Sequence, residues 1–309
     1  MTDLFDRRFL FVIGKGGVGK TTVSAALGLA AARRGKRVLI AMANAKERLS
    51  TLLEVAPVGP HNQPVTSTID AVNMVPQHAL EEYGLIVLKS RTLQRAIFDN
   101  RIVSALLRGT PGIEAWSMLG KAFFHTKETL ADGRPRYDLV ILDAPATGHG
   151  LDMLRVPRVI LDVAPPGLLR REAEDAVALF RDPSRGGVVL VTLPEDMPVS
   201  ETLELHTALR DELAMPVHAL VVNQVLPRLF SADERDVVRS LGEAVSASSP
   251  LATLARAGRG RVLREEVQEA SLARLAAALP RLPRVELPMW SSPSFQRAAI
   301  ESLSLAFGP

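Results

Sequence analysis

Residues 14–22 read Gly-Lys-Gly-Gly-Val-Gly-Lys-Thr-Thr and satisfy the pattern G-x-x-x-x-G-K-[ST]. Glycines let successive backbone N–H groups approach phosphate oxygens without side-chain clashes. In this pattern Lys20 contacts the β- and γ-phosphates, Thr21 offers its hydroxyl to Mg²⁺, and Thr22 bonds the α-phosphate. The predicted phosphate-binding residues are Gly16, Gly17, Val18, Gly19, Lys20, Thr21 and Thr22.

The apolar run at residues 9–13 and the helix-like stretch at 20–34 flank this loop. A glycine-rich turn that merely joins a strand to a helix is the alternative, and the complete strand-loop-helix context argues against it. We therefore expect the loop to bind ATP.

Asp143 is the second candidate in the site. It ends the apolar run at 137–142, which is typical of a buried strand with an acidic residue at its carboxyl end, the Walker B arrangement. Such a carboxylate holds magnesium through a water molecule. Thr21 and Asp143 are therefore the predicted Mg²⁺ residues.

Lys15 follows the first glycine directly, which the general pattern does not require. In this respect the loop resembles the deviant Walker A loop of the class that contains MinD, ParA and the nitrogenase iron protein. The resemblance implies that Lys15 reaches across a dimer interface to the partner's nucleotide, where a second positive charge would support hydrolysis. A lysine that is simply solvated in the loop is the alternative.

Residues 143–149 read Asp-Ala-Pro-Ala-Thr-Gly-His and closely resemble switch II of the ArsA branch. This branch holds the arsenite-pump ATPases and the ATPases of guided entry of tail-anchored proteins. The similarity extends to residues 150–157, 191–195, 221–224 and 287–288, so it covers nearly the whole chain.

That resemblance assigns further roles. Gly148 is expected to give a backbone N–H to the γ-phosphate, Asn223 to read the adenine edge, and Pro288 with Met289 to lie on the adenine face. His149 is expected to make a structural hydrogen bond in the switch loop rather than to act in catalysis.

The chain departs from the family after the strand at 37–42, where the family has an Asp that orients the attacking water. Asn44 is the best positional match, and a carboxamide can hold a water but cannot accept its proton. Lys15, Lys20, Asn44 and Asp143 are therefore the predicted catalytic residues, and slow turnover is expected. Glu47 is an alternative water-positioning group, although a solvated charge is the default for it.

The sequence contains no cysteine, so it lacks the arsenite-binding thiols and the C-x-x-C zinc clamp found in this family. Arsenic transport is therefore not expected. The 37 basic and 34 acidic residues nearly cancel, and nucleic acid is not implied as a partner. The sequence contains no uninterrupted run of eighteen apolar residues, so no membrane-spanning segment is predicted, and we expect a cytoplasmic protein.

The elements around these residues alternate between strand-like and helix-like stretches, which predicts an α/β fold with a doubly wound, mostly parallel sheet and helices on both faces. We expect one P-loop NTPase domain over residues 1–309. Apolar residues at helical spacing predict an inserted helical subdomain at 79–130. Strands are predicted at 9–13, 37–42, 68–75, 137–142, 158–163, 187–193 and 217–222, and a final helix pair at 261–279 and 294–305 brackets a proline-bearing loop at 282–293.

The combined interpretation is an ArsA-like ATPase, a dimeric switch driven by Mg²⁺ and ATP whose protein cargo or effector is not identified. The alternative is a regulatory or scaffold subunit that binds ATP with little or no hydrolysis. In either case the missing carboxylate favours pairing with a paralogous ATPase, although a homodimer also fits. A membrane-positioning protein of the MinD kind is disfavoured because residues 294–307 contain a single basic residue, Arg297.

Overall fold

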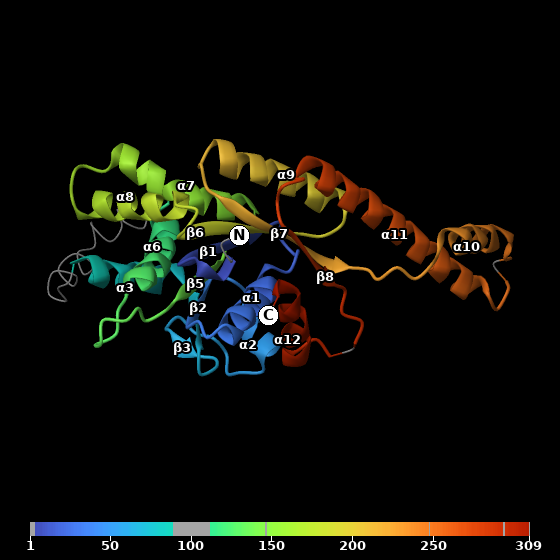
Figure 1. Cartoon of the computed structure of the whole chain (residues 1–309), viewed down its shortest axis with the longest axis horizontal. Helices are drawn as coiled ribbons and strands as arrows, with labels where there is room; N and C mark the ends of the chain where they lie inside the picture. Colours follow the sequence, from blue (N-terminus) through green and yellow to red (C-terminus); the bar gives the residue numbers. More distant parts are fainter. Residues whose placement is uncertain (1–3, 89–111, 146, 247, 293, 309) are drawn as a thin grey trace.

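A computed structural model describes residues 4–88, 112–145, 147–246, 248–292 and 294–308. Its centre is an eight-stranded sheet in the order β3-β4-β2-β5-β1-β6-β7-β8 (Figure 1). All neighbouring strands are parallel except the antiparallel pair β3 and β4. The strands are β1 (Phe9–Gly14), β2 (Val38–Ala43), β3 (Gln63–Pro64), β4 (Ile69–Met74), β5 (Leu139–Asp143), β6 (Gly186–Thr192), β7 (Val217–Val225) and β8 (Arg284–Pro288). The predicted α/β class with a mostly parallel sheet is confirmed.

Helices cover both faces of the sheet, because the central strands are apolar on both sides (Figure 1). One face carries α1 (Lys20–Arg33), α2 (Leu49–Leu53) and α12 (Arg297–Ser304), with a core that includes Leu27, Ile40 and Ile300. The other carries α6 (Ile113–Lys127), α7 (Thr147–Val163), α8 (Leu168–Arg181) and α9 (Asp196–Asp211) over a core that includes Phe11, Phe123 and Phe180.

The segment predicted as an inserted helical subdomain lies between β4 and β5. It contains α3 (Pro76–Leu88) and α6, while its residues 89–111 lie outside the described part of the chain. The side chains of Tyr83 on α3 and Trp116 on α6 are buried and pack edge to face. Buried Lys121 also pairs with Glu82, so the two helices are tied together and packed on the core.

At the opposite end of the molecule, α10 (Ala232–Ala244) and α11 (Ala252–Ala278) form a hairpin that projects beyond the sheet (Figure 1). Ser231 and Glu234 form a capping box at the start of α10. Arg235 of α10 lies 3.0 Å from the buried carboxylate of Glu265 on α11, and Arg261 lies 2.8 Å from the same carboxylate. This ionic cluster fixes one helix of the hairpin against the other.

Two sequence predictions are corrected. The strand predicted at 158–163 is the second half of α7, which continues through Pro157. Its β-branched residues suggested a strand, but Ile160 packs into the helical core while Val159 and Val163 are exposed, as expected of one face of a helix. The proline-bearing loop at 282–293 contains β8, which is tolerated because Pro288 ends an edge strand. Among the described helices, none is long and apolar enough to cross a membrane.

Gly120 permits the close approach of α6 to α3, and this predicts an effect on stability. A Cβ atom on Gly120 would lie 2.6 Å from the Tyr83 ring, whose position the packing against Trp116 fixes. Gly120→Ala should therefore lower the free energy of unfolding by roughly 1–3 kcal/mol. Gly260→Ala is the matched control, because beyond the adjacent residues and backbone of α11 no heavy atom lies within 4 Å of its Cβ position. It should raise stability by up to about 1 kcal/mol. Urea unfolding of the two variants measures the difference, and equal effects would contradict this packing constraint.

Candidate nucleotide-binding site

The sequence-predicted site residues meet where parallel strands end at one edge of the sheet. Strand β1 lies between β5 and β6; it leads to α1 on one face of the sheet, whereas β5 and β6 lead to α7 and α9 on the other. Such a switch point is where open α/β sheets bind ligands. In the register of β1 and β5, Val12 is paired with Asp143. The loop that follows Gly14 therefore begins close to the Asp143 carboxylate.

Glycines shape this loop. A Cβ atom on Gly14 would lie 2.1 Å from the carbonyl oxygen of Val191 on β6, so no other residue fits there. Gly17 and Gly19 have φ angles of 86° and 91°, in the left-handed region that favours glycine. A Cβ atom on Gly19 would also lie 2.3 Å from Nδ2 of Asn223. The backbone is thus bent into a turn whose last residue is the N-cap of α1. N–H groups at such a helix start attract anions.

Lys20 begins α1 and folds back over the loop. Its Nζ donates to the carbonyl oxygens of Gly14 at 3.1 Å and Lys15 at 3.0 Å. Burial lowers the pKa of Lys20, and the nearby Asp143 carboxylate opposes that shift. The ammonium is therefore held above the loop by two neutral acceptors that a charged phosphate can replace.

Thr21 and Asp143 are brought into direct contact. The Thr21 hydroxyl donates to Oδ2 of Asp143 at 2.6 Å, joining the start of α1 to the end of β5. Asp143 is 2% exposed, and its Oδ1 atom has no hydrogen-bond partner among the described residues. Burial raises the pKa of Asp143 from 3.8 to about 6, although the Thr21 hydrogen bond and Lys20 oppose the shift. A buried carboxylate oxygen beside a hydroxyl fits the hard oxygen-ligand chemistry of Mg²⁺.

Lys15 points away from its own loop to helix α9. Its Nζ lies 2.7 Å from Oε1 of Glu201, and both side chains are about one-third exposed. The residue is therefore accessible at the surface of the site, but it is already paired with a carboxylate of its own chain.

Asn44 follows β2 at the same edge of the sheet. Met42 on β2 is paired with Asp143, so Asn44 lies two residues beyond that level on the neighbouring strand. It is exposed, and its φ of 48° is a left-handed conformation that asparagine tolerates. Glu47 accepts hydrogen bonds from the backbone N–H of Ser50 at 2.8 Å and from the Ser50 hydroxyl. Glu47 is thereby hydrogen-bonded to the first turn of α2, whereas Asn44 is exposed to solvent.

The switch II segment crosses the same edge. Ala146 lies outside the described residues, and α7 begins at Thr147. Gly148 and His149 are exposed in the first turn of this helix. A Cβ atom on Gly150 would lie 2.9 Å from the Pro145 carbonyl oxygen and 3.1 Å from Ile13, so the turn packs tightly on the end of β1. The first turn of α7, which contains Gly148, therefore lies beside the end of β1, where the phosphate loop begins.

Asn223 lies directly behind the loop. Its Nδ2 donates to the Val18 carbonyl oxygen at 2.9 Å, and its Oδ1 accepts from the Gln224 N–H at 3.0 Å. Pro288 ends β8, and the Met289 N–H donates to the Val225 carbonyl oxygen at 2.8 Å. Of the three predicted adenine residues, Asn223 therefore contacts the loop, while Pro288 and Met289 lie at the end of β8, beside the end of β7.

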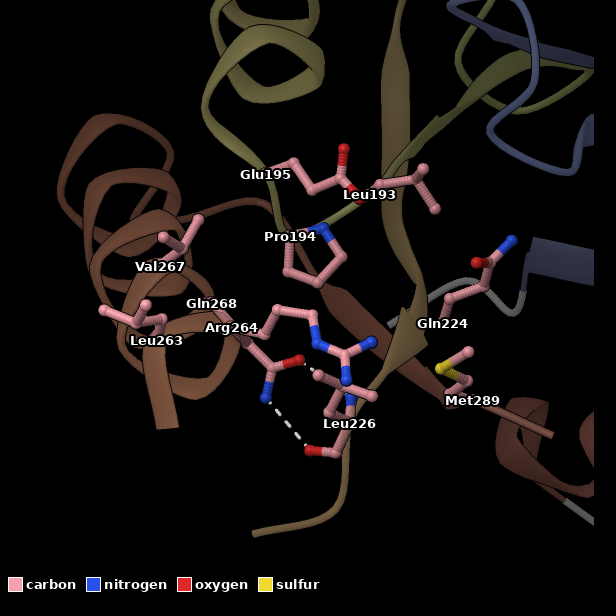
Figure 2. A pocket seen from close by; sticks show the side chains of 10 residues that line it. All are labelled: Leu193, Pro194, Glu195, Gln224, Leu226, Leu263, Arg264, Val267, Gln268 and Met289. Atoms are coloured by element: carbon pink, nitrogen blue, oxygen red, sulfur yellow. Dashed lines mark hydrogen bonds between the residues drawn. The ribbon is translucent and has the colours of Figure 1, made fainter. Parts of the chain in front are cut away.

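A pocket of about 460 Å³ opens beside these strand ends (Figure 2). Gln268 of α11 closes one wall by exchanging two hydrogen bonds with the Leu226 backbone, at 2.7 and 3.0 Å. Met289 lines the pocket, whereas Asn223 and Pro288 do not. The full lining is Leu193, Pro194, Glu195, Gln224, Leu226, Leu263, Arg264, Val267, Gln268 and Met289.

The sequence matches the anion-transporting ATPase family (ArsA) over residues 7–164 and 169–238. The chain belongs to this family. It is 29% identical over 304 residues to ATPase BagA of Mycobacterium tuberculosis, an alignment that covers 91% of this chain and 87% of that protein. It is 28% identical to an arsenical pump-driving ATPase of Escherichia coli, covering 74% of this chain but 41% of the pump ATPase. An ATPase ASNA1 homolog of Entamoeba dispar is 26% identical, with 71% and 77% covered.

This membership confirms the suspected family and makes the chain an ATP-binding ArsA-like protein with the ATPase fold of that family. The individual roles of the site residues stay predictions. Two groups that the structure places at the site were not predicted from the sequence, the α11 wall of the pocket and Glu201. Pro194 and Glu195 fell within a family-like segment, but Glu201 carries no sequence signal, because many helices expose acidic residues.

The buried Asp143 carboxylate predicts an unusual dependence of stability on pH. Because its folded pKa of about 6 exceeds the unfolded value, the folded chain binds the proton more tightly. The contribution of Asp143 to the unfolding free energy should therefore fall by about 3 kcal/mol as pH rises from about 4 to 6. Asp143→Asn removes this penalty, so its stability relative to the wild type should rise across that window when both lack Mg²⁺ and nucleotide. Urea unfolding at several pH values measures it, and a pH-independent difference would contradict the assignment.

Proposed function

We propose that this chain is a nucleotide-driven switch that binds Mg²⁺ and ATP at the loop between β1 and α1. The observation that carries the proposal is the 2.6 Å contact between Thr21 and Asp143, with the second carboxylate oxygen buried and lacking a partner among the described residues. A hydroxyl and a carboxylate so placed would hold Mg²⁺, which neutralises charge on the phosphates when bound.

The phosphates would lie in the glycine loop. Backbone N–H groups of Gly16 to Gly19 would surround them, while Lys20 would exchange its two carbonyl acceptors for phosphate oxygens. Thr22 would bond the α-phosphate, and the Gly148 N–H at the start of α7 would face the γ-phosphate. In each case a group that now bonds within the chain or faces solvent gains an anionic partner.

The nucleoside would extend toward the ends of β7 and β8. Asn223 would read the adenine edge and Pro288 with Met289 would cover its face, which requires Asn223 to release the Val18 carbonyl oxygen. The pocket bounded by Met289 and α11 provides the adjoining apolar volume.

Dimerisation would complete the switch. Lys15 would reach the phosphates held by a partner subunit, either a second copy or a paralogous ATPase, and so couple association to nucleotide binding. Its partial exposure makes its ammonium accessible for this contact. The protein cargo or effector that such a switch would control is a separate molecule outside this site.

Hydrolysis by this chain would be slow, because Asn44 stands where a carboxylate would accept the proton of the attacking water. A second candidate function follows from the same residue, a regulatory subunit that binds ATP and leaves hydrolysis to a paralogous partner. Both functions need the phosphate loop, and they differ in the turnover of the purified chain.

Lys20→Ala tests nucleotide binding. Removal of the ammonium should weaken Mg²⁺-dependent ATP affinity roughly 100-fold or more, about 3 kcal/mol, because it makes charge-assisted bonds to the phosphates. Lys36→Ala is the control, since Lys36 lies beyond the far end of α1 and pairs only loosely with Asp6 at 3.5 Å. Calorimetry with ATP and Mg²⁺ measures both, and unchanged affinity in a folded Lys20→Ala chain would refute the site.

Asn44→Asp tests the missing water-positioning group. Aspartate also tolerates the left-handed backbone at this position, so the variant should fold and its ATP turnover should rise at least tenfold, given the roughly 10²- to 10⁴-fold value of general bases. Asn44→Gly is the control, because it keeps the backbone conformation and offers no side chain. If steady-state phosphate release is brisk in the wild type and indifferent to both changes, another group positions the water.

A further inference from the structure

Helix α9 supplies Lys15 with a counter-ion from its own subunit. The Lys15 ammonium lies 2.7 Å from the Glu201 carboxylate, with exposed side-chain fractions of 29% and 32%. The two residues come from different elements, the phosphate loop and the second turn of α9. The ion pair therefore joins two elements and restrains the Lys15 side chain, unlike an ion pair within a single helix.

The backbone of Lys15 is held as well. Its carbonyl oxygen accepts a hydrogen bond from the Lys20 ammonium at 3.0 Å. If Lys20 turns to the β- and γ-phosphates when ATP binds, this bond is lost. Nucleotide in the chain's own site therefore removes one of two restraints on Lys15 and leaves the pair with Glu201.

Glu201 itself cannot follow a departing lysine far, because its helix is anchored. Val199, Thr202 and Leu205 are buried against the sheet. Arg274 of α11 donates to Asp196 at 3.0 Å and to the Ser200 hydroxyl at 2.9 Å, which fixes the first turns of α9. A movement of Lys15 toward another subunit would therefore separate the ion pair.

Charge decides which partner Lys15 takes. A carboxylate in contact with an ammonium that also contacts a triphosphate would be repelled by the phosphate charge. The Lys15 ammonium would therefore leave the single negative charge of Glu201 and bind the larger negative charge of the phosphates.

We propose that Glu201 is a positioning residue that holds Lys15 within its own subunit until the partner's phosphates replace it. This inference rests on the proposed role of Lys15 across the dimer interface. Glu201 then opposes association, so that dimers form only when the gain from phosphate contact exceeds the loss of the internal pair.

A double-mutant cycle with Lys15→Ala and Glu201→Gln tests the proposal. The dimer dissociation constant is measured by sedimentation with Mg²⁺ and a non-hydrolysable ATP analogue, in the presence of the native partner subunit if the chain alone stays monomeric. Glu201→Gln should lower the dimer dissociation constant roughly two- to fivefold for each ion pair released, because partly exposed ion pairs typically contribute that much to an equilibrium constant. In the Lys15→Ala background the same change should have no effect.

Glu204→Gln is the matched control. Glu204 lies three residues further along α9, is exposed, and pairs with no cation that the structure describes. It removes the same charge without touching Lys15, so it should leave association unchanged. Glu201→Asp keeps the charge on a shorter side chain and should fall between the wild type and Glu201→Gln. ATP affinity of the monomer, which does not involve Glu201, should be equal in all variants and verifies folding.

The outcomes distinguish the role of Lys15 across the interface from the role of Glu201 as its internal counter-ion. If Lys15→Ala leaves association unchanged, the role of Lys15 across the interface fails and takes this inference with it. If Lys15→Ala weakens association but Glu201→Gln weakens it too or has no effect, the role of Lys15 stands and the internal counter-ion is refuted. Equal tightening by Glu201→Gln and Glu204→Gln would also refute it, since general charge reduction would then explain both.

Discussion

The contact between the Thr21 hydroxyl and the Asp143 carboxylate is the interaction on which the site depends. It joins the start of α1 to the end of β5 and so requires two elements separated by more than a hundred residues to meet at 2.6 Å. The parallel register of β1 and β5 makes this possible, because it places Asp143 level with Val12 and the phosphate loop just beyond. A carboxylate with a raised pKa at that point is a cost to the fold. Such a cost is expected where function requires a buried charge.

The charged side chains around the loop bond to partners within the chain. Lys20 is bonded to two carbonyl oxygens, Lys15 to Glu201, and Asp143 to Thr21. Each of these contacts involves a side chain that the proposed nucleotide or Mg²⁺ would also bind. Binding of nucleotide would therefore exchange internal partners for phosphate oxygens and magnesium rather than fill an inert cleft. An exchange of this kind would link occupancy of the site to the positions of α1 and α9.

Much of the framework was readable from the sequence because its signals are local. Buried parallel strands appear as short apolar runs, and the strand-loop-helix around Gly14 carries its own glycines and N-terminal helix signals. The strand predicted at 158–163 was wrong because β-branched residues favour a strand locally, while packing against the helical core decides in favour of α7. The edge strand β8 was missed because its prolines suggest a loop, and its pairing with β7 is a long-range contact.

The sequence by itself determined the family and predicted the phosphate loop, the Walker B carboxylate and the departure at Asn44, since each depends on residue type at a fixed spacing along the chain. Only the tertiary structure decided that Glu201 pairs with Lys15, that Asn223 bonds the back of the loop through Val18, and that α11 walls the pocket beside Met289. These contacts join segments far apart in the chain, and their geometry comes from the order of the strands and the packing of helices on the sheet. An acidic residue on a helix has no spacing that reveals its partner, so its role emerges when the fold brings the two charges together.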